Sequence, residues 1–135
     1  MQEAIQEDII ADFELFDDWT DKYEHLIDFA KELKPFDEKD KKDEHLVRGC
    51  QSKVWLTARV EDGKIFYAAD SDALITKGIA GLLIKILSGR SPEEVLSAEL
   101  YALERIGLKE HLSPNRANGL ASMIKMMKSY AQVLS

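Results

Sequence analysis

Cys50 is the only cysteine of this 135-residue chain, and it lies in the segment Val47-Arg48-Gly49-Cys50-Gln51-Ser52-Lys53-Val54-Trp55-Leu56. A single thiol forms no disulfide within the chain and offers a metal ion only one ligand. It therefore either fills space in the core or takes part in chemistry. The preceding glycine and the two polar residues that follow predict a turn, and the alternating apolar residues after them predict a strand. We therefore expect the thiol to lie at a bend that leads into a strand.

The other residues that could bind a metal or a phosphate do not occur at the spacing that such sites need. Zinc sites use clusters of cysteine and histidine, whereas Cys50 is accompanied only by the scattered His25, His45 and His111. We expect each histidine to be exposed or satisfied by hydrogen bonds, and nothing indicates that His45 faces Cys50 as in a thiol protease. The segment Gly78-Ile79-Ala80-Gly81 lies in a predicted helix, which excludes a phosphate-binding loop. We therefore expect the chain to carry no metal and no cofactor.

A nucleophilic thiol needs nearby positive charge, a helix N-terminus or hydrogen-bond donors. Arg116 is a candidate, because it is the third residue of a helix opened by Ser113-Pro114. A guanidinium is unfavourable beside the positive end of the helix dipole, which suggests a partner such as a carboxylate or an anionic sulfur. An exposed arginine in contact with water is the simpler interpretation, and the sequence alone favours it. Asp72, expected in the first turn of another helix, is explained adequately as a partner of that helix dipole.

Length and composition predict one soluble globular domain over residues 1–135. Hydrophobic residues make up 45% of the chain and charged residues 32%, which argues against disorder. No apolar run approaches the ~20 residues of a membrane helix, so we expect no membrane association. The N-terminus is acidic and lacks an apolar signal core. We expect a cytoplasmic location, where a free thiol remains reduced.

The net charge of −7 is spread unevenly along the chain. Residues 1–45 hold 16 acidic and 6 basic residues, whereas residues 46–135 hold 9 acidic and 12 basic residues. Overall negative charge opposes nucleic-acid binding. The acidic half is expected to form solvated helix faces, and an acidic surface for a protein partner is the alternative.

The first third of the chain is predicted to form two amphipathic helices, because apolar residues recur there at helical spacing. Asp17 or Asp18 would cap the second helix, and Pro35 would end it. The polar segment 37–44 is predicted to be a surface loop. The apolar positions of the two helices are Ile5, Ile9, Phe13 and Phe16, and then Trp19, Tyr23, Leu26, Ile27, Ala30 and Leu33.

The middle third is predicted to form a small antiparallel sheet of about three strands, at residues 45–48, 53–60 and 65–69. Asp62-Gly63, between the last two, is a strong signal for a hairpin turn. The sheet would begin directly after the Cys50 turn.

Helical signals return after residue 70. Asp70 or Ser71 would cap a long, buried helix that ends at Leu87. Gly78 and Gly81 each cost this helix about 1 kcal/mol relative to alanine. We therefore expect both glycines to pack closely against another backbone, either the sheet or the Cys50 turn.

Shorter helices are predicted near residues 92–96 and 100–106, and a final helix begins at Ser113-Pro114. The order of helices, sheet and helices is that of an α+β fold, with a small antiparallel sheet flanked by N-terminal and C-terminal helices.

The segment around Cys50 resembles the signature of the SufE family, which are sulfur acceptors that work with cysteine desulfurases in iron–sulfur cluster assembly. Three further segments are similar to the family and occur in the family's order: Phe16 to Ile27, Asp70 to Gly78 and His111 to Leu120. The resemblance covers nearly the whole chain and implies a SufE-like fold.

The resemblance also implies roles for single residues. The family's acceptor cysteine corresponds to Cys50, its arginine after Ser/Thr-Pro to Arg116, and the second aspartate of its Asp-Ser-Asp to Asp72. Residue 53 is lysine here, where glutamine is common in relatives. The remaining supporting residues of the signature are Gly49, Gln51 and Ser52.

The mechanism implied by the resemblance is a sulfur relay. A SufS-like desulfurase that contains pyridoxal phosphate forms a persulfide on its own cysteine, and the Cys50 thiolate attacks the terminal sulfur. Cys50 then passes the sulfur to an iron–sulfur scaffold of the SufBCD kind. The pyridoxal phosphate belongs to the partner, and this chain would be an accessory sulfur-transfer protein and activator rather than a stand-alone enzyme. A monomer and a homodimer are both compatible with the sequence.

Two other functions stay open at this point. One is a stand-alone single-cysteine enzyme, such as a thiol peroxidase or a sulfurtransferase acting on small molecules. The other is an interaction module with a structural cysteine. The apolar alternation beside Cys50 adds the expectation that the resting thiol is tucked against apolar side chains and shielded from oxidation.

Overall fold

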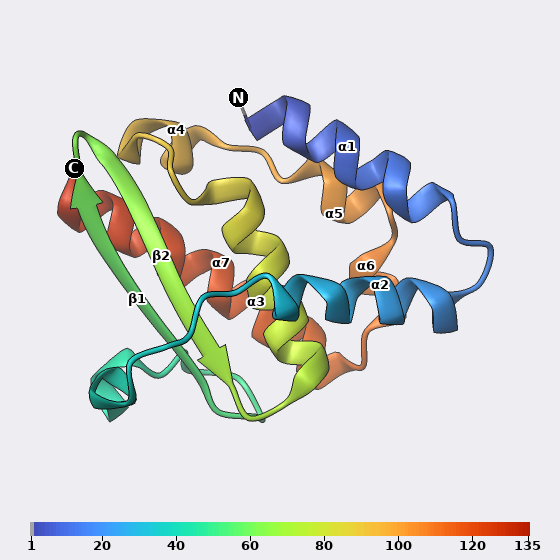
Figure 1. The fold of residues 1–135 in the computed structure, drawn as a ribbon, viewed down its shortest axis with the longest axis horizontal. Coiled ribbons are helices and arrows are strands. Elements are labelled where there is room, and N and C mark those ends of the chain that lie inside the picture. The colour runs from blue at the N-terminus through green and yellow to red at the C-terminus, as the bar shows by residue number, and fades with distance from the viewer. Residues whose placement is uncertain (1) are drawn as a thin grey trace.

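The computed structural model describes residues 2–135, and in it a two-stranded antiparallel sheet lies beside a group of helices (Figure 1). The predicted α+β class is confirmed, but the sheet has two strands rather than about three. The elements are α1 (Gln2–Glu14), α2 (Trp19–Lys31), η1 (Glu38–Asp40), η2 (Asp43–His45), β1 (Val54–Glu61), β2 (Lys64–Ser71), α3 (Leu74–Leu87), α4 (Pro92–Ser97), α5 (Tyr101–Arg105), α6 (Leu108–His111) and α7 (Pro114–Leu134).

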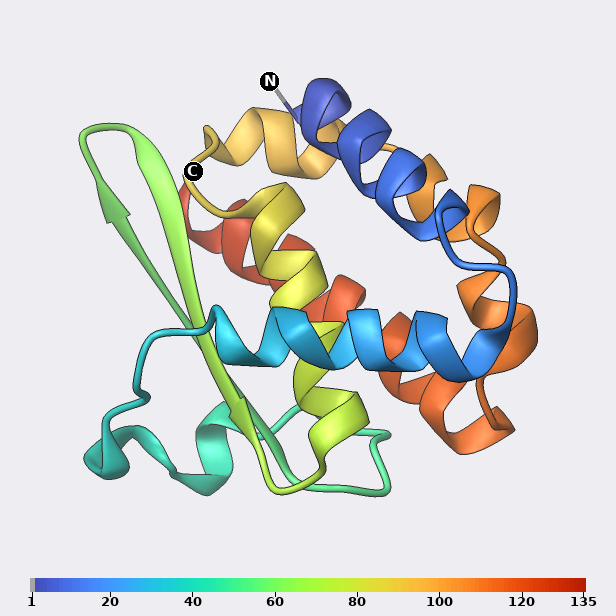
Figure 2. The ribbon, with the colours of Figure 1, turned by 45° about the vertical axis from the view of Figure 1, so that its right-hand side comes forward.

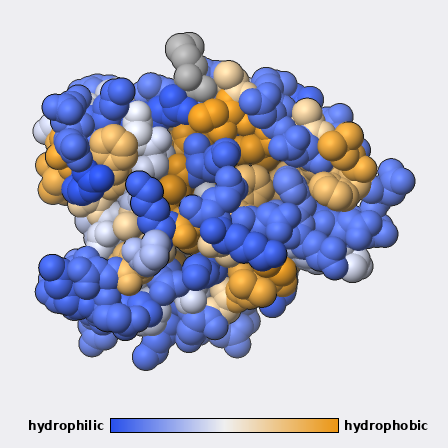
Figure 3. Space-filling view, viewed as in Figure 1, coloured by the Kyte–Doolittle hydropathy of each residue, from blue (hydrophilic) through white to orange (hydrophobic). Residues whose placement is uncertain are grey.

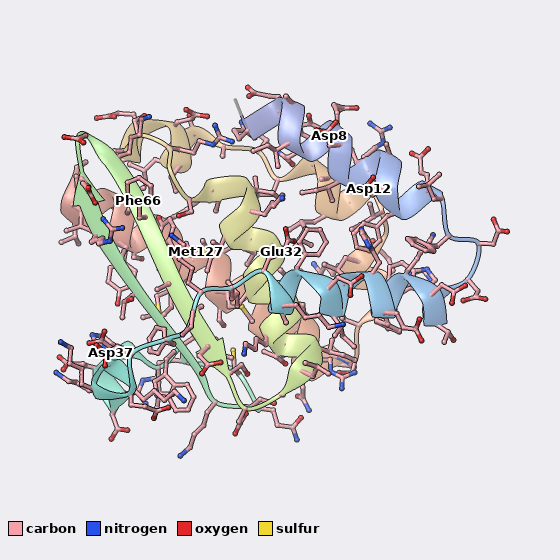
Figure 4. The ribbon with its side chains drawn as sticks, viewed as in Figure 1. Asp8, Asp12, Glu32, Asp37, Phe66 and Met127 are labelled. Atoms are coloured by element: carbon pink, nitrogen blue, oxygen red, sulfur yellow. The ribbon has the colours of Figure 1, made fainter. Side chains whose placement is uncertain are left out.

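The two N-terminal helices form where they were predicted. Asp18 caps α2, since its carboxylate accepts a hydrogen bond of 2.9 Å from the Asp21 N–H. The helix ends at Lys31, before Pro35. Asp8 and Asp12 are exposed on α1 (Figure 4), and the surface over α2 is mostly hydrophilic (Figure 3). Asp8 and Asp12 therefore lie on a solvated face of α1, as expected.

Gln6 joins α1 to the start of α5 through one buried and one part-buried hydrogen bond. Its side chain is fully buried, its Nε2 donates to Glu99 O at 2.9 Å, and its Oε1 accepts from Ala102 N at 3.0 Å. Leu100, the N-cap residue of α5, makes no side-chain cap. Gln6 therefore caps α5 from a distant part of the chain.

The hairpin turns at Asp62 and Gly63, which both have positive φ, 53° and 75°. This geometry matches the right-handed twist of the two strands and sets the register from Val54↔Ser71 to Glu61↔Lys64. The predicted hairpin is confirmed, whereas the strand predicted at residues 45–48 is wrong. Only an isolated bridge, Leu46↔Trp55, forms there, because the 3-10 turn η2 precedes it and a turn at residues 48–49 follows it.

One face of the hairpin packs on α3 and α7 (Figures 1 and 2). Tyr67 is buried, and its hydroxyl donates a hydrogen bond of 2.6 Å to the carbonyl of Met127, which is labelled in Figure 4. Tyr130 OH donates to Leu56 O at 3.0 Å. Two tyrosines, one from β2 and one from α7, thus fix the last helix against the sheet.

The long helix α3 starts later than predicted and packs on a different partner. Its N-cap is Ala73, without a side-chain cap, because Asp70 and Ser71 are still part of β2. A Cβ at Gly78 would lie 2.6 Å from Leu26 O, and one at Gly81 would lie 2.3 Å from Phe29 O. Close backbone packing is therefore present, but it is with α2, not with the sheet or the Cys50 turn.

The C-terminal helices follow their capping signals. Ser91 caps α4 by accepting from Glu94 N at 3.1 Å, and Ser113 caps α7 by accepting from Arg116 N at 3.3 Å. The helix α6, which begins after Gly107 at φ 74°, was not predicted. In the part of the chain that the structure describes, no helix is both long and apolar enough to span a membrane.

Candidate functional site

Cys50 lies near the tip of a loop, residues 47–54, that is closed at its base. Val47 N donates to Val54 O at 2.8 Å, so the first and last residues of the loop are joined. Gly49 has φ 89°, a left-handed conformation that side chains other than glycine rarely adopt. The predicted turn that leads into a strand is therefore present.

The loop docks along one face of α7. Three successive loop residues meet helix residues that are four and three positions apart, a spacing that places side chains on one helix face. The pairs are Gly49 with Ser122, Cys50 with Gly119, and Gln51 with Asn115.

Each of the two outer pairs depends on the residue types present. A Cβ at Gly49 would lie 2.7 Å from Ser122 Oγ, closer than carbon and oxygen atoms approach. Asn115 Nδ2 donates a hydrogen bond of 3.0 Å to Gln51 Oε1. The loop is thus held on α7 in two places. The Gly49 backbone lies close to the Ser122 side chain, and the Gln51 amide accepts a hydrogen bond from Asn115.

The thiol itself is half-buried between the hydrophobic core and the α7 backbone. Cys50 Sγ lies 3.8 Å from Gly119 O, and it packs against the core on another side. Burial raises the pKa of the Cys50 thiol above its ordinary value. The thiol in this position is therefore less ionised at neutral pH than a free cysteine. The α7 backbone at Gly119 covers part of the thiol, where the sequence predicted that apolar side chains would surround it.

A pocket of about 270 Å³ opens beside the thiol. No histidine lines it within residues 2–135, so a cysteine–histidine pair has no support, and Arg116 is the only ionisable group besides the thiol. The pocket brings together four of the predicted site residues with four others: Cys50, Gln51, Ser52 and Arg116, and in addition Thr76, Ser113, Asn115 and Gly119.

Arg116 is exposed and lies at the edge of this pocket. Its side chain forms no ion pair with a carboxylate of residues 2–135, as the simpler interpretation of its position expected. Its guanidinium is therefore available to an anion in the pocket.

Asp72 does not line the pocket, and its predicted position in a helix is wrong. It precedes the first residue of α3 by two positions, because β2 extends to Ser71. Its Oδ1 accepts from Lys53 N at 3.1 Å, and its own N–H donates to Lys53 O at 3.2 Å. Asp72 thus fastens the end of the Cys50 loop to the β2–α3 connection.

Four residues of the pocket were not predicted as site residues from the sequence: Thr76, Ser113, Asn115 and Gly119. A glycine inside a helix costs about 1 kcal/mol relative to alanine, and this cost signals close approach of another chain segment. Gly119 fits that signal. Thr76 is the only polar residue among the buried residues of α3, which is a weaker signal.

Two of the three histidines are satisfied by contacts with backbone carbonyl groups. His45 Nδ1 and His111 Nδ1 lie 2.7 and 2.8 Å from backbone carbonyl oxygens, as expected. His25 departs from the expectation, since its Nε2 is buried without a hydrogen-bond partner in residues 2–135. Its ring packs edge-on against Phe13 and Phe29, with centroids 4.7 and 5.3 Å away.

Two larger grooves lie elsewhere on the protein, and Cys50 does not line either of them. One, of about 660 Å³, lies between the segment after α2 and the hairpin, and its lining includes Glu32, Asp37 and Phe66 (Figure 4). The other, of about 750 Å³, lies between α5 and α7. Neither contains a cysteine or a group of side chains comparable with the Cys50 pocket.

Comparisons with known proteins agree with one another. The SufE family, described as an Fe-S metabolism associated domain, matches residues 7–131. An uncharacterized SufE-like protein from Synechocystis sp. is 40% identical over 123 residues, which cover 91% of this chain and 77% of that protein. SufE-like protein 1, chloroplastic/mitochondrial, from Arabidopsis thaliana is 40% identical over 126 residues, 93% of this chain but 34% of the plant protein.

Among solved structures, the solution structure of a hypothetical protein from Thermus thermophilus is similar, with a TM-score of 0.78. The match covers 96% of this chain and 94% of that one at 24% identity, so it bears on the fold alone. The family match extends over nearly all of the chain and includes the Cys50 loop, the β2–α3 connection and the start of α7. The chain therefore belongs to the SufE family, which is associated with Fe-S metabolism.

Proposed function

We propose that Cys50 accepts sulfur from the persulfide of a pyridoxal-phosphate cysteine desulfurase and passes it to an iron–sulfur assembly scaffold. The Cys50 thiolate attacks the terminal sulfur of the partner's persulfide, and a new S–S bond forms on Cys50. The old S–S bond breaks, and its electron pair leaves with the partner's cysteine as a thiolate. One sulfur atom has moved with no net oxidation or reduction.

The observation that carries the proposal is the placement of the thiol. Cys50 lies on a loop whose base is tied to the sheet, while its tip rests on α7 through few contacts. A surface loop of this kind can move, and a thiol on it can enter another protein's active site. Family membership in Fe-S metabolism supports the same role.

The raised pKa of Cys50 supports an accessory role rather than independent catalysis. A thiol that is mostly protonated at rest reacts slowly, and it becomes a better nucleophile where a partner supplies positive charge or donors. Activation on docking would restrict sulfur transfer to the correct partner and would increase the turnover of the desulfurase.

Within this proposal, Arg116 and Asp72 have different parts. Arg116, exposed at the pocket, would stabilise the anionic sulfur during transfer. Asp72 would hold the end of the loop through Lys53. Gly49, Gln51 and Ser52 would shape the loop and the pocket around the thiol.

A stand-alone thiol enzyme is less well supported, because no histidine or carboxylate of the described residues lines the pocket to act as a base. An interaction module would not need the thiol at all. We place the protein in the cytoplasm, since a free thiol persists there. Both a monomer and a homodimer are compatible with this function.

Desulfurase turnover tests the proposal. We expect added protein to increase the rate of alanine release from cysteine, and the Cys50→Ser variant to lose this effect. Asn118→Ala, an exposed change on α7, serves as the control. Full stimulation by Cys50→Ser would favour the interaction module, and sulfur turnover without any desulfurase would favour the thiol enzyme.

A further inference from the structure

We propose that the Thr76 hydroxyl donates a hydrogen bond to the terminal sulfur of the Cys50 persulfide. This inference rests on the proposed function, because it concerns the sulfur-loaded form of Cys50. It adds a residue on α3 that would contact the transferred atom.

Thr76 is a buried residue of α3 with a polar side chain. The residue is only 7% exposed, and every other buried residue of α3 is apolar or glycine. It lines the pocket beside Cys50. A hydroxyl at the wall of a pocket can donate a hydrogen bond to a water molecule or a ligand inside it.

The pocket has room for the added sulfur. Its volume of about 270 Å³ exceeds several times the ~30 Å³ that one water molecule occupies in the liquid. The α7 backbone at Gly119 already covers one side of Cys50 Sγ, at 3.8 Å. A second sulfur bonded to Sγ would therefore extend into the pocket, toward the residues that line it.

The charge of a persulfide makes donors useful there. A persulfide is more acidic than a thiol, so its terminal sulfur is anionic at neutral pH and favours hydrogen-bond donors. The Asn115 amide already donates to Gln51, and Arg116 is exposed. Among the hydroxyl residues that line the pocket within residues 2–135, Ser52 is half-buried and Ser113 exposed, so Thr76 is the most buried. A hydrogen bond to a charged atom is strengthened where water is excluded.

The two sulfur states would thus be held differently. The resting thiol is neutral and rests on Gly119, whereas the loaded form gains a contact with α3. That contact would keep the persulfide ionised and retain it against thiols other than the proper acceptor.

The experiment loads Cys50 chemically, so that it does not depend on a desulfurase. The Cys50 thiolate attacks inorganic hydrodisulfide, HS–S⁻, takes one sulfur, and HS⁻ leaves. The ionisation midpoint of the persulfide is then read from the pH dependence of its alkylation, in the wild type, Thr76→Val and Thr76→Ser. Within residues 2–135, Arg116 is the only other ionisable group that lines the pocket, and the nearby Asp72 carboxylate accepts a hydrogen bond from Lys53 N. Both groups are present in all three proteins, so a difference in the midpoint reports on residue 76.

We expect Thr76→Val to raise the persulfide midpoint by about one pH unit. Thr76→Ser should stay near the wild type, and the midpoint of the unloaded thiol should change little in either variant. Thr57→Val, which removes a hydroxyl in the other groove, should change nothing. Thr76→Ala replaces Thr76→Val if the valine variant does not fold.

Equal persulfide midpoints in Thr76→Val and the wild type would overturn the inference, as would equal shifts of the loaded and unloaded forms. Failure of the desulfurase to load Cys50 would contradict the proposed function instead, and the chemical loading would still decide the part played by Thr76.

Discussion

Cys50 Sγ lies 3.8 Å from the carbonyl oxygen of Gly119, and a Cβ on residue 119 would lie only 3.1 Å from the sulfur. The thiol is therefore seated where the helix presents backbone instead of a side chain. This contact explains both the partial burial of Cys50 and the presence of a glycine in the second turn of α7.

Replacing Gly119 with alanine should displace the Cys50 thiol from its contact with the α7 backbone. The new methyl group would press on Sγ, while the helix itself would gain about 1 kcal/mol of intrinsic stability. Weakening the seat by about 1 kcal/mol would increase the open population of the loop about fivefold. We expect iodoacetamide to alkylate Cys50 faster by about this factor. Asn118→Ala controls for helix propensity, and equal alkylation rates in Gly119→Ala and the wild type would contradict the seating.

The raised pKa of Cys50 predicts a pH dependence of reactivity and stability. The midpoint of alkylation should lie above the ordinary thiol value of about 8.5 in the folded protein and return to it in urea. Because the folded pKa is the higher one, the folded state holds the proton more tightly. The associated stability is complete below the unfolded pKa and is lost as pH rises through the folded pKa.

Urea titrations at several alkaline pH values measure this loss. Cys50→Ala should show a smaller decrease in unfolding free energy between about pH 8.5 and the folded midpoint. The same decrease in both proteins would show that another group titrates there.

Loss of the Asp72 carboxylate should loosen the loop without unfolding the protein. Asp72→Ala removes the acceptor for Lys53 N, whereas Asp72→Asn keeps an oxygen at that place. We expect faster proteolysis or alkylation of the 47–54 loop in Asp72→Ala and near wild-type behaviour in Asp72→Asn. If both variants behaved like the wild type, Asp72 would have no part in anchoring the loop.

Gln6→Leu should destabilise the protein, because it removes the partner of a buried backbone N–H, Ala102 N, and of a part-buried carbonyl, Glu99 O. The expected loss is about 2 kcal/mol of unfolding free energy, measured by urea titration. Gln132→Leu, an exposed change on α7, provides the matched control. Unchanged stability of Gln6→Leu would mean that water replaces the lost hydrogen bonds.

The parts of the fold that sequence predicted are those set by neighbouring residues. The Asp62-Gly63 hairpin and the caps at Asp18, Ser91 and Ser113 depend on local turn and capping chemistry, and all four are present. The Cys50 turn belongs to the same group, since Gly49 and the polar residues Gln51 and Ser52 favour it locally.

The parts that sequence missed depend on contacts between distant residues. The pairing of Val54 with Ser71 lengthens β2 and thereby removes Asp70, Ser71 and Asp72 from the start of α3. Gly78 could be assigned a close contact but not its partner on α2. Thr76 and Gly119 become site residues only because α3 and α7 both reach the Cys50 loop.

The most direct test of the central claim is the intact mass of the chain after incubation with a cysteine desulfurase and cysteine. The account predicts a mass increase of one sulfur atom, located on the peptide that contains Cys50, removed by dithiothreitol and absent in Cys50→Ser. A chain that gains no sulfur while the desulfurase turns over cysteine, or that gains it equally in Cys50→Ser, would contradict the account.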